Sequence, residues 1–167
     1  MRRNKKGISP LIATVLIIGF TIVIAALVIT WGTNLFKKTQ QQTGELSDVN
    51  LACTEVLGSM DINANVDPNA PGTLTLTVDN GANREVGGFT LRVYNADQTS
   101  AETIDSSDAT KVTSPDGTDV LAASGLKTFT VTYDSSLVAE VGKVGVRPKV
   151  NVKGKLEPCQ GESEREL

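Results

Sequence analysis

The apolar residues of this chain are concentrated near its N-terminus. No charged residue occurs between Gly7 and Lys37, and the stretch from Leu11 to Trp31 is almost continuously apolar. A helix of about 21 residues is roughly 31 Å long, which matches the thickness of a bilayer core. Ile, Val and Thr are weak helix formers in water, but in lipid the backbone groups can bond only to one another. The pattern predicts a membrane-spanning helix.

This helix is expected to cover residues 8–44. The polar stretch after Lys38 is compatible with a solvated helical stem, and Gly44 is typical of a helix end. Residues 45–58 form a junction for which two interpretations stay open, a last helical turn or two, or a lead-in to the first strand.

From Ser59 onward the apolar residues alternate with polar ones. Alternation with period two indicates strands with one buried face. Turn-forming residues separate these runs, and no amphipathic helix lies between them, so residues 59–153 are predicted to form an antiparallel β-sandwich. The fold class is therefore α+β, and residues 154–167 are expected to be a charged tail, loose beyond Cys159. The alternating runs are 60–66, 73–78, 89–94, 128–133 and 144–152.

Two segments of this region, Thr77-Val-Asp-Asn-Gly81 and Leu121–Val131, resemble immunoglobulin-like extracellular modules. The resemblance implies an immunoglobulin-like arrangement of the sandwich.

Composition argues against several classes of function. The chain has no histidine, the commonest general base and metal ligand, and no nucleophile motif or phosphate-binding loop appears. We therefore expect no enzyme activity, no catalytic residues, no cofactor and no metal centre. Because the net charge is −3 and four of the 16 basic residues precede the apolar run, the remainder is acidic and nucleic-acid binding is not expected.

Two cysteines, Cys53 and Cys159, lie far apart in the sequence. Two thiolates without histidine cannot complete a structural zinc site, which needs four ligands. In an extracytoplasmic domain a disulfide between them is expected. The alternative is two free, buried thiols.

The longest polar stretch, residues 95–119, is rich in Ser, Thr and Asp. It is a candidate for adhesion, O-glycosylation or calcium binding by Asp105, Asp108, Asp116 or Asp119, and the alternative is a solvated, mobile loop. No Asn-x-Ser/Thr sequence occurs, so standard N-glycosylation is not predicted.

The charges that flank the apolar run set its orientation. Four basic residues precede it and Lys37 and Lys38 follow it, which favours a cytoplasmic N-terminus with the polar domain outside. An ordinary signal peptide would have a shorter apolar core, and Ile29-Thr30-Trp31-Gly32 is a poor cleavage site. A plain single-span anchor and a leader cut on the cytoplasmic side of the helix remain as interpretations.

The residues from Lys5 to Leu16, Lys-Lys-Gly-Ile-Ser-Pro-Leu-Ile-Ala-Thr-Val-Leu, resemble the leader and helix start of archaeal type IV pilins. The resemblance implies that a prepilin peptidase removes residues 1–7 by cleavage between Gly7 and Ile8, with Lys5 and Lys6 as leader determinants. Bacterial type IV pilins carry a glutamate at the position of Ile12, so a glutamate-guided docking step is not implied here.

The resemblance implies a structural subunit that leaves the membrane and polymerises through its helix into a cell-surface filament, for adhesion. Its partners would be copies of itself, the prepilin peptidase and the pilus assembly machinery. Two alternatives remain, an archaellin of the motility filament and an uncleaved, membrane-anchored sandwich that binds a ligand. The helix residues expected to serve the membrane and the filament are Ile8, Leu11, Ile12, Val15, Leu16, Gly19, Ile22, Ala26 and Trp31.

Overall fold

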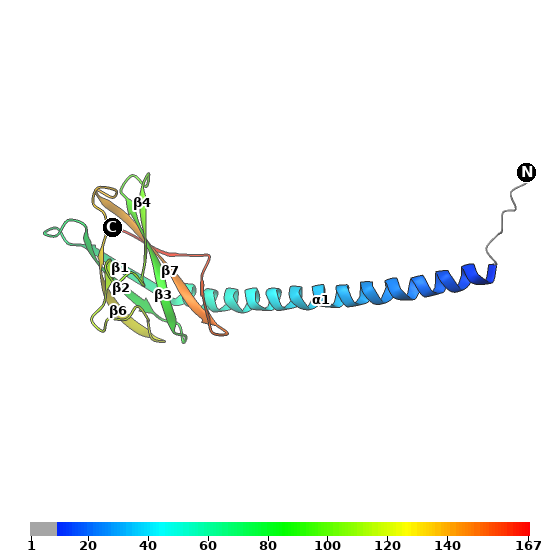
Figure 1. The fold of residues 1–167 in the computed structure, drawn as a ribbon. Helices are drawn as coiled ribbons and strands as arrows, with labels where there is room; N and C mark the ends of the chain where they lie inside the picture. Colours follow the sequence, from blue (N-terminus) through cyan, green and yellow to red (C-terminus); the bar gives the residue numbers. More distant parts are fainter. Residues whose placement is uncertain (1–9) are drawn as a thin grey trace, which may run out of the picture. The chain divides into compact units, whose positions relative to one another are not determined.

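The computed structural model describes residues 10–167, without the side chains of residues 10, 41–43 and 45. The chain divides into two compact units, residues 1–44 and 45–167. A 50-residue helix, α1 (Pro10–Ser59), belongs to both units, and every strand belongs to the second, the β domain (Figure 1). The predicted fold class, α+β with a long apolar helix before antiparallel strands, is confirmed.

Helix α1 ends at Ser59, so the prediction of an end at Gly44 is wrong. Gly44 does not adopt the left-handed conformation of a helix-ending glycine, and one glycine inside a helix costs only about 1 kcal/mol. Beyond it, Ala52 and Val56 are 1% and 0% exposed and belong to the core of the β domain. This packing holds the junction in the helical form, which was one of its two interpretations.

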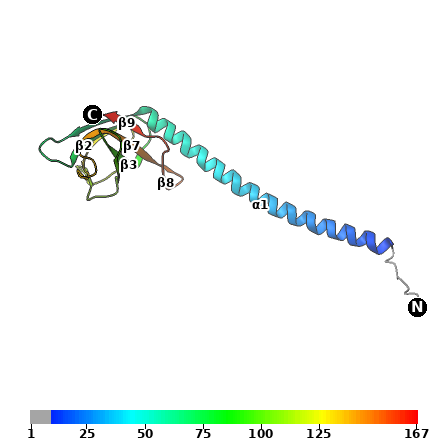
Figure 2. The same cartoon turned by 90° about the horizontal axis from the view of Figure 1, so that it is seen from above.

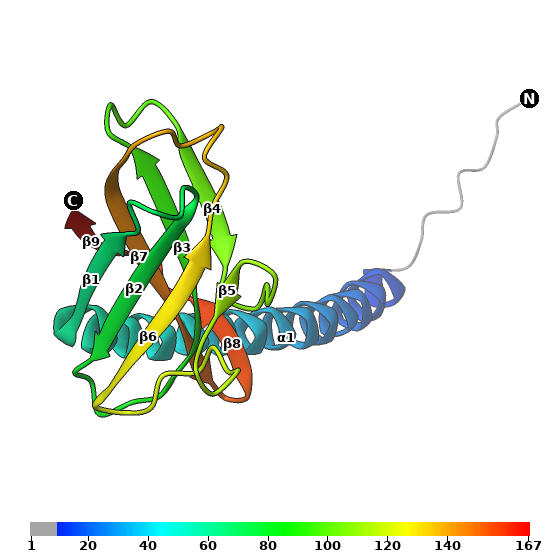
Figure 3. The ribbon, with the colours of Figure 1, turned by 90° about the vertical axis from the view of Figure 1, so that its left-hand side faces the viewer.

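The strands form two antiparallel sheets. One sheet has the order β1-β2-β6-β5, and the other has the order β4-β3-β7-β8 with β9 also paired to β7 (Figure 3). Figure 2 shows β7, β8 and β9 from above. The strands are β1 (Met60–Val66), β2 (Thr73–Asn80), β3 (Val86–Asn95), β4 (Ala101–Asp105), β5 (Val112–Thr113), β6 (Gly125–Thr132), β7 (Val141–Val152), β8 (Lys155–Pro158) and β9 (Ser163–Glu166).

The C-terminal residues are ordered, so the prediction of a loose tail is wrong. Both β8 and β9 pair with β7, as in the partners Val152 and Lys155 or Val144 and Arg165. The physical reason is that β3 occupies only one edge of β7. The backbone groups on the other edge of β7 are free to bond to the chain as it returns in β8 and β9. Ser163 also donates a hydrogen bond to the carbonyl of Met60 at 3.4 Å, which connects β9 to β1.

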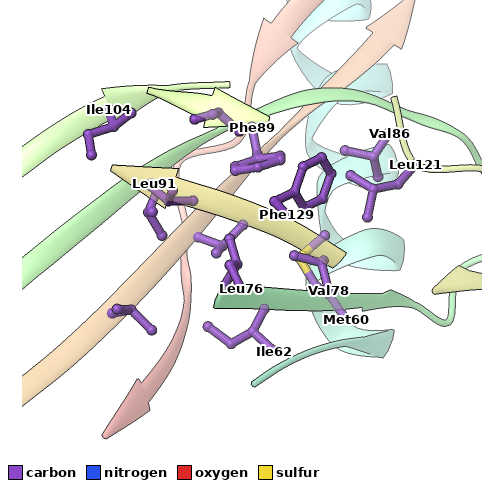
Figure 4. Packing of buried hydrophobic residues seen from close by; sticks show 14 of the residues in the cluster. Met60, Ile62, Leu76, Val78, Val86, Phe89, Leu91, Ile104, Leu121 and Phe129 are labelled. Carbon is purple, nitrogen blue, oxygen red and sulfur yellow. The ribbon is translucent and has the colours of Figure 1, made fainter. Parts of the chain in front are cut away.

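The core lies between the two sheets. Phe89 from β3 and Phe129 from β6 are both fully buried, and their rings meet edge-to-face at 4.8 Å (Figure 4). Leu76 and Leu91 are also completely buried. These inward positions are the apolar members of the alternating runs, which is why the runs on β1, β2, β3, β6 and β7 predict strands correctly.

Candidate functional site

The apolar part of α1 is exposed to solvent in the described chain. A 30-residue segment, Leu11–Gln40, has a mean hydropathy of 3.0 in its most apolar window, and none of that window is buried. By length and composition it is able to cross a membrane, a property that a signal sequence shares. The expected helix residues that the structure describes are all exposed: Leu11, Ile12, Val15, Leu16, Gly19, Ile22, Ala26 and Trp31.

The exposed residues surround the helix rather than forming a stripe. Leu16, Ile17 and Ile18 follow one another and are 65%, 63% and 58% exposed. Successive residues lie about 100° apart around a helix, so all sides are apolar. A helix of this kind needs a bilayer or other helices around it.

The hydroxyl groups of this helix are satisfied internally. Thr14, Thr21 and Thr30 donate hydrogen bonds of 2.8–2.9 Å to carbonyls three or four residues earlier. Each threonine thereby loses its need for water, which lowers the cost of placing it among apolar groups. The threonines are compatible with an apolar environment.

Two glycines on the apolar part of α1, Gly19 and Gly32, have open space beside them in the described chain. A Cβ at Gly19 or Gly32 would meet no atom within 4 Å, apart from the helix's own adjacent backbone. Each leaves a thin place on the helix surface where a second helix can approach closely.

The candidate processing residues Lys5, Lys6, Gly7 and Ile8 lie outside the described residues. Cleavage between Gly7 and Ile8 therefore stays a prediction from the sequence.

The predicted disulfide is present. Cys53 on α1 and Cys159 after β8 are joined, with their Cα atoms 5.5 Å apart, and both are buried. The amide of Cys159 donates a 2.9 Å hydrogen bond to the carbonyl of Pro148 on β7. The bridge spans a sequence separation of 106, for which the chain-entropy model gives about 4–5 kcal/mol of stabilisation. It fixes the last turns of α1 to the end of the β domain.

Residues 95–119 are ordered rather than a mobile loop, because they contain β4, β5 and a series of short turns. Their aspartates do not converge on a cation site. Asp105 pairs with Lys149 at 2.5 Å, Asp108 accepts bonds from Thr110, and Asp119 accepts from Ser106 at 2.8 Å. Among the described residues, no group of three or more His, Cys, Asp or Glu could hold a metal.

Asp116 is held in its charged form by its neighbours. Lys127 donates to its carboxylate at 2.9 Å and Thr118 donates through its amide at 3.1 Å, and these bonds lower the pKa of Asp116 far below its usual value. These bonds fix the turn before Thr118.

A cluster that the sequence does not reveal lies on the outer face of the β3–β7 sheet. The Glu162 carboxylate accepts a 2.8 Å hydrogen bond from Tyr94 and lies 3.7 Å from Arg92 and 3.6 Å from Arg147. A Cβ at Gly145 would lie 3.1 Å from this carboxyl group, so the glycine makes room for it. The pKa of Tyr94 is raised, first by burial and then by its bond to Glu162. The cluster fastens the C-terminal segment to the sheet.

Comparison with known proteins gives no family, because no family model matches the chain. The uncharacterized protein MJ1402 of Methanocaldococcus jannaschii is 34% identical over 76 residues, which is 45% of this chain and 22% of that protein. The uncharacterized protein MJ1403 of the same organism is 46% identical over 41 residues, 25% of this chain and 11% of that protein. The chain thus matches well under a third of the length of either relative.

Among solved structures, a GH20 exo β-N-acetylglucosaminidase from Vibrio harveyi, in complex with N-acetylglucosamine, matches 60% of this chain and 17% of that chain. The sequence identity is 13% and the TM-score is 0.32, a likeness that carries no argument about activity.

Proposed function

We propose that this chain is the subunit of an archaeal type IV pilus-like surface filament, matured by cleavage between Gly7 and Ile8. The observation that carries the proposal is the apolar part of the helix segment Leu11–Gln40, whose most apolar window is apolar on all sides and has no buried residue in the described chain. Such a segment is stable in a membrane before assembly and among copies of itself afterwards.

The energy available from helix packing is large. Burying on the order of 1,500 Å² of apolar surface per subunit, at ~25 cal/mol per Å², is worth tens of kcal/mol before the entropy of association is subtracted. Filament cohesion would rest on this burial. The exposed side chains of Leu16, Ile22 and Trp31 would contribute to it from different sides of the helix.

The residues before the helix support processing rather than permanent anchoring. Lys5, Lys6 and Gly7 stand directly before the apolar run, and a charged leader keeps the N-terminus in the cytoplasm. Its removal leaves a helix start without those charges, which is able to leave the bilayer. In this account a prepilin peptidase and the pilus assembly machinery are the partners, and the precursor lies in the cell membrane with the β domain outside.

The β domain would be displayed on the filament surface, where it is available for adhesion. The disulfide joins the last turns of α1 at Cys53 to the C-terminal segment at Cys159. The Glu162 cluster holds the same C-terminal segment on the sheet that contains β3. The proposal gives the domain no catalytic role.

Substitution of Gly7 tests this function in the source organism. We expect Gly7→Val to accumulate in the membrane with residues 1–7 retained and to form no filaments visible by electron microscopy. Gly44→Ala is the control, because Gly44 lies beyond the apolar segment Leu11–Gln40 and a Cβ there meets no atom within 4 Å, and it should form filaments normally.

Filaments made by Gly7→Val would contradict the proposal. A wild-type chain that keeps residues 1–7 would instead favour an uncleaved, single-span protein that displays a binding sandwich. A wild-type filament whose loss abolishes swimming, and leaves attachment to surfaces intact, would identify an archaellin.

A further inference from the structure

Two arginines lie close together on the outer face of the sheet that contains β3 and β7 (Figure 3). Arg92 is on β3, and its partner in the register is Gly145, two residues before Arg147 on β7. Partners on antiparallel strands point to the same side of a sheet, as do residues two apart along one strand. The side chains of Arg92 and Arg147 are 37% and 36% exposed, so solvent reaches both of them.

The carboxylate of Glu162 does not satisfy these two arginines. It lies 3.7 Å from Arg92 and 3.6 Å from Arg147, both longer than a hydrogen bond, and its 2.8 Å bond is to Tyr94. Nε of Arg147 is buried and has no hydrogen-bond partner among the described residues. Each guanidinium group carries five donor hydrogens, so the pair keeps donors for a further acceptor.

The group formed by Arg92, Arg147 and Glu162 keeps one positive charge. Its neighbours on the same face are ion pairs of their own, Lys143–Glu164 and Lys149–Asp105. Glu166 lies opposite Lys143, which is about 13 Å along β7 from Arg147. The site is thus locally positive, although the β domain holds all 19 acidic residues of the chain and is acidic as a whole.

A ligand with a single carboxylate matches this site. Guanidinium groups bind carboxylates through parallel, charge-assisted hydrogen bonds, and one negative charge neutralises the one positive charge. A nucleic acid or another polyphosphate carries far more negative charge and is disfavoured by the acidic domain around the site.

The surroundings of the arginines favour a saccharide over a peptide as the source of the carboxylate. β3 lies between β4 and β7, and β7 lies between β3 and the strands β8 and β9. Neither strand therefore offers a free edge that could bond to a peptide backbone. Threonines flank the arginines, with Thr103 opposite Arg92 and Thr90 opposite Arg147. Their hydroxyl groups can both donate to and accept from the hydroxyl groups of a sugar.

We infer that Arg92 and Arg147 form a binding site for the carboxylate of a uronic acid, the acidic unit of many polysaccharides. The ring of Tyr94, 4.9 Å from the guanidinium carbon of Arg92, helps to hold that side chain in place. One site of this kind binds weakly, with a Kd on the order of 1 mM, because a few hydrogen bonds must offset the lost freedom of the ligand.

The inference goes beyond the filament function, since it needs only the folded β domain. In a filament, the repeated sites would bind a uronic-acid polymer with much higher avidity than one site alone.

Saturation-transfer NMR on the full chain in detergent tests the site, with galacturonic acid as the probe. Galactose is the matched ligand, because it has a hydroxymethyl group in place of the carboxylate. We expect galacturonic acid to bind roughly tenfold more tightly than galactose, since only the acid engages both arginines. Equal binding of the two sugars would overturn the inference. Binding of N-acetylaspartate as tight as that of galacturonic acid would overturn the assignment to a saccharide.

Substitutions locate the binding on the protein. Arg92→Gln with Arg147→Gln should weaken the binding of galacturonic acid roughly tenfold or more. Arg84→Gln with Arg165→Gln is the matched control, because it removes the same charge outside the site and should leave binding unchanged.

A second pair of variants covers the case in which the glutamine variant does not fold. Arg92→Lys with Arg147→Lys keeps both charges but loses the planar donors, and should weaken binding by about three- to tenfold. The urea midpoint of each variant reports whether its β domain is folded. Undiminished binding in a folded variant of either pair would overturn the inference. Binding by a wild-type chain that keeps residues 1–7 would support it and contradict the filament function alone.

Discussion

The two units of this chain use similar apolar residues in opposite ways. Phe20 on the N-terminal part of α1 is 68% exposed, whereas Phe89 in the β domain is 0% exposed. The β domain is complete in one chain, because two sheets and the last turns of α1 cover one another's apolar faces. The apolar part of α1 has no such cover among the described residues. The apolar surface of the first unit therefore needs a bilayer or other helices around it.

The disulfide gives the largest expected effect on the β domain. Cys53→Ala with Cys159→Ala should lower the free energy of unfolding of this domain by about 4–5 kcal/mol. Without the bridge the unfolded chain gains conformational entropy, which favours the unfolded state. Urea unfolding of the full chain in detergent, followed by the near-ultraviolet circular dichroism of the tyrosines, measures it. An unchanged midpoint would mean that the bridge adds nothing to stability.

A matched pair of phenylalanines compares the two units directly. Phe89→Ala should lower the free energy of unfolding of the β domain by about 3–5 kcal/mol, since it removes a buried ring that packs on Phe129. Phe20→Ala should leave that free energy unchanged, because its ring is exposed in the chain. Equal losses in the two variants would contradict the division into two units.

Gly19 lies on the apolar part of α1 and allows a test of helix packing between subunits. Gly19→Leu should leave the unfolding of the β domain unchanged, since Gly19 lies in the first unit and an added Cβ there meets no atom within 4 Å in the described chain. It should weaken helix packing between subunits by roughly 1–3 kcal/mol per contact, because a close approach is overfilled. The yield of sedimentable filaments measures this, with Gly44→Ala as control. Normal filament yield from Gly19→Leu would place Gly19 outside the subunit contact.

Acid affects only one of the two units. The Lys127 bond lowers the pKa of Asp116 from its usual 3.8, so its contribution to stability is present above that value and is lost as the pH falls below it. The urea midpoint of the β domain should therefore fall less steeply below about pH 4 in Asp116→Asn than in the wild type. The helix content of the first unit in detergent should not change, since residues 8–36 carry no ionisable side chain. Identical slopes in the two proteins would contradict this role of Asp116.

The strands with a strong alternating pattern could be predicted from the sequence, and the others could not. β2 alternates Leu74, Leu76 and Val78 with polar residues, and its inward side is fully buried. β9 has no apolar residue, because it pairs with the edge of β7 through its backbone and its outward side chains are charged. Pairing of this kind leaves no periodic signal in the sequence.

For residues 45–58 two interpretations were open, but the sequence contains a helical pattern there. Four apolar residues recur there at helical spacing and belong to the core of the β domain or pack against it: Val49, Ala52, Cys53 and Val56. The Glu162 cluster gave no signal, because Tyr94 and Glu162 are 68 residues apart and meet only through the fold. The disulfide could be predicted, since the chain offers only one pair of cysteines.

The most direct test of the proposed function is the intact mass of the protein isolated from the surface of its own cells, after removal of any attached sugar. We expect a chain that begins at Ile8 and keeps the whole apolar helix, because the leader is removed and the helix enters the filament. A chain that still carries residues 1–7 would contradict it and would leave a membrane-anchored β domain.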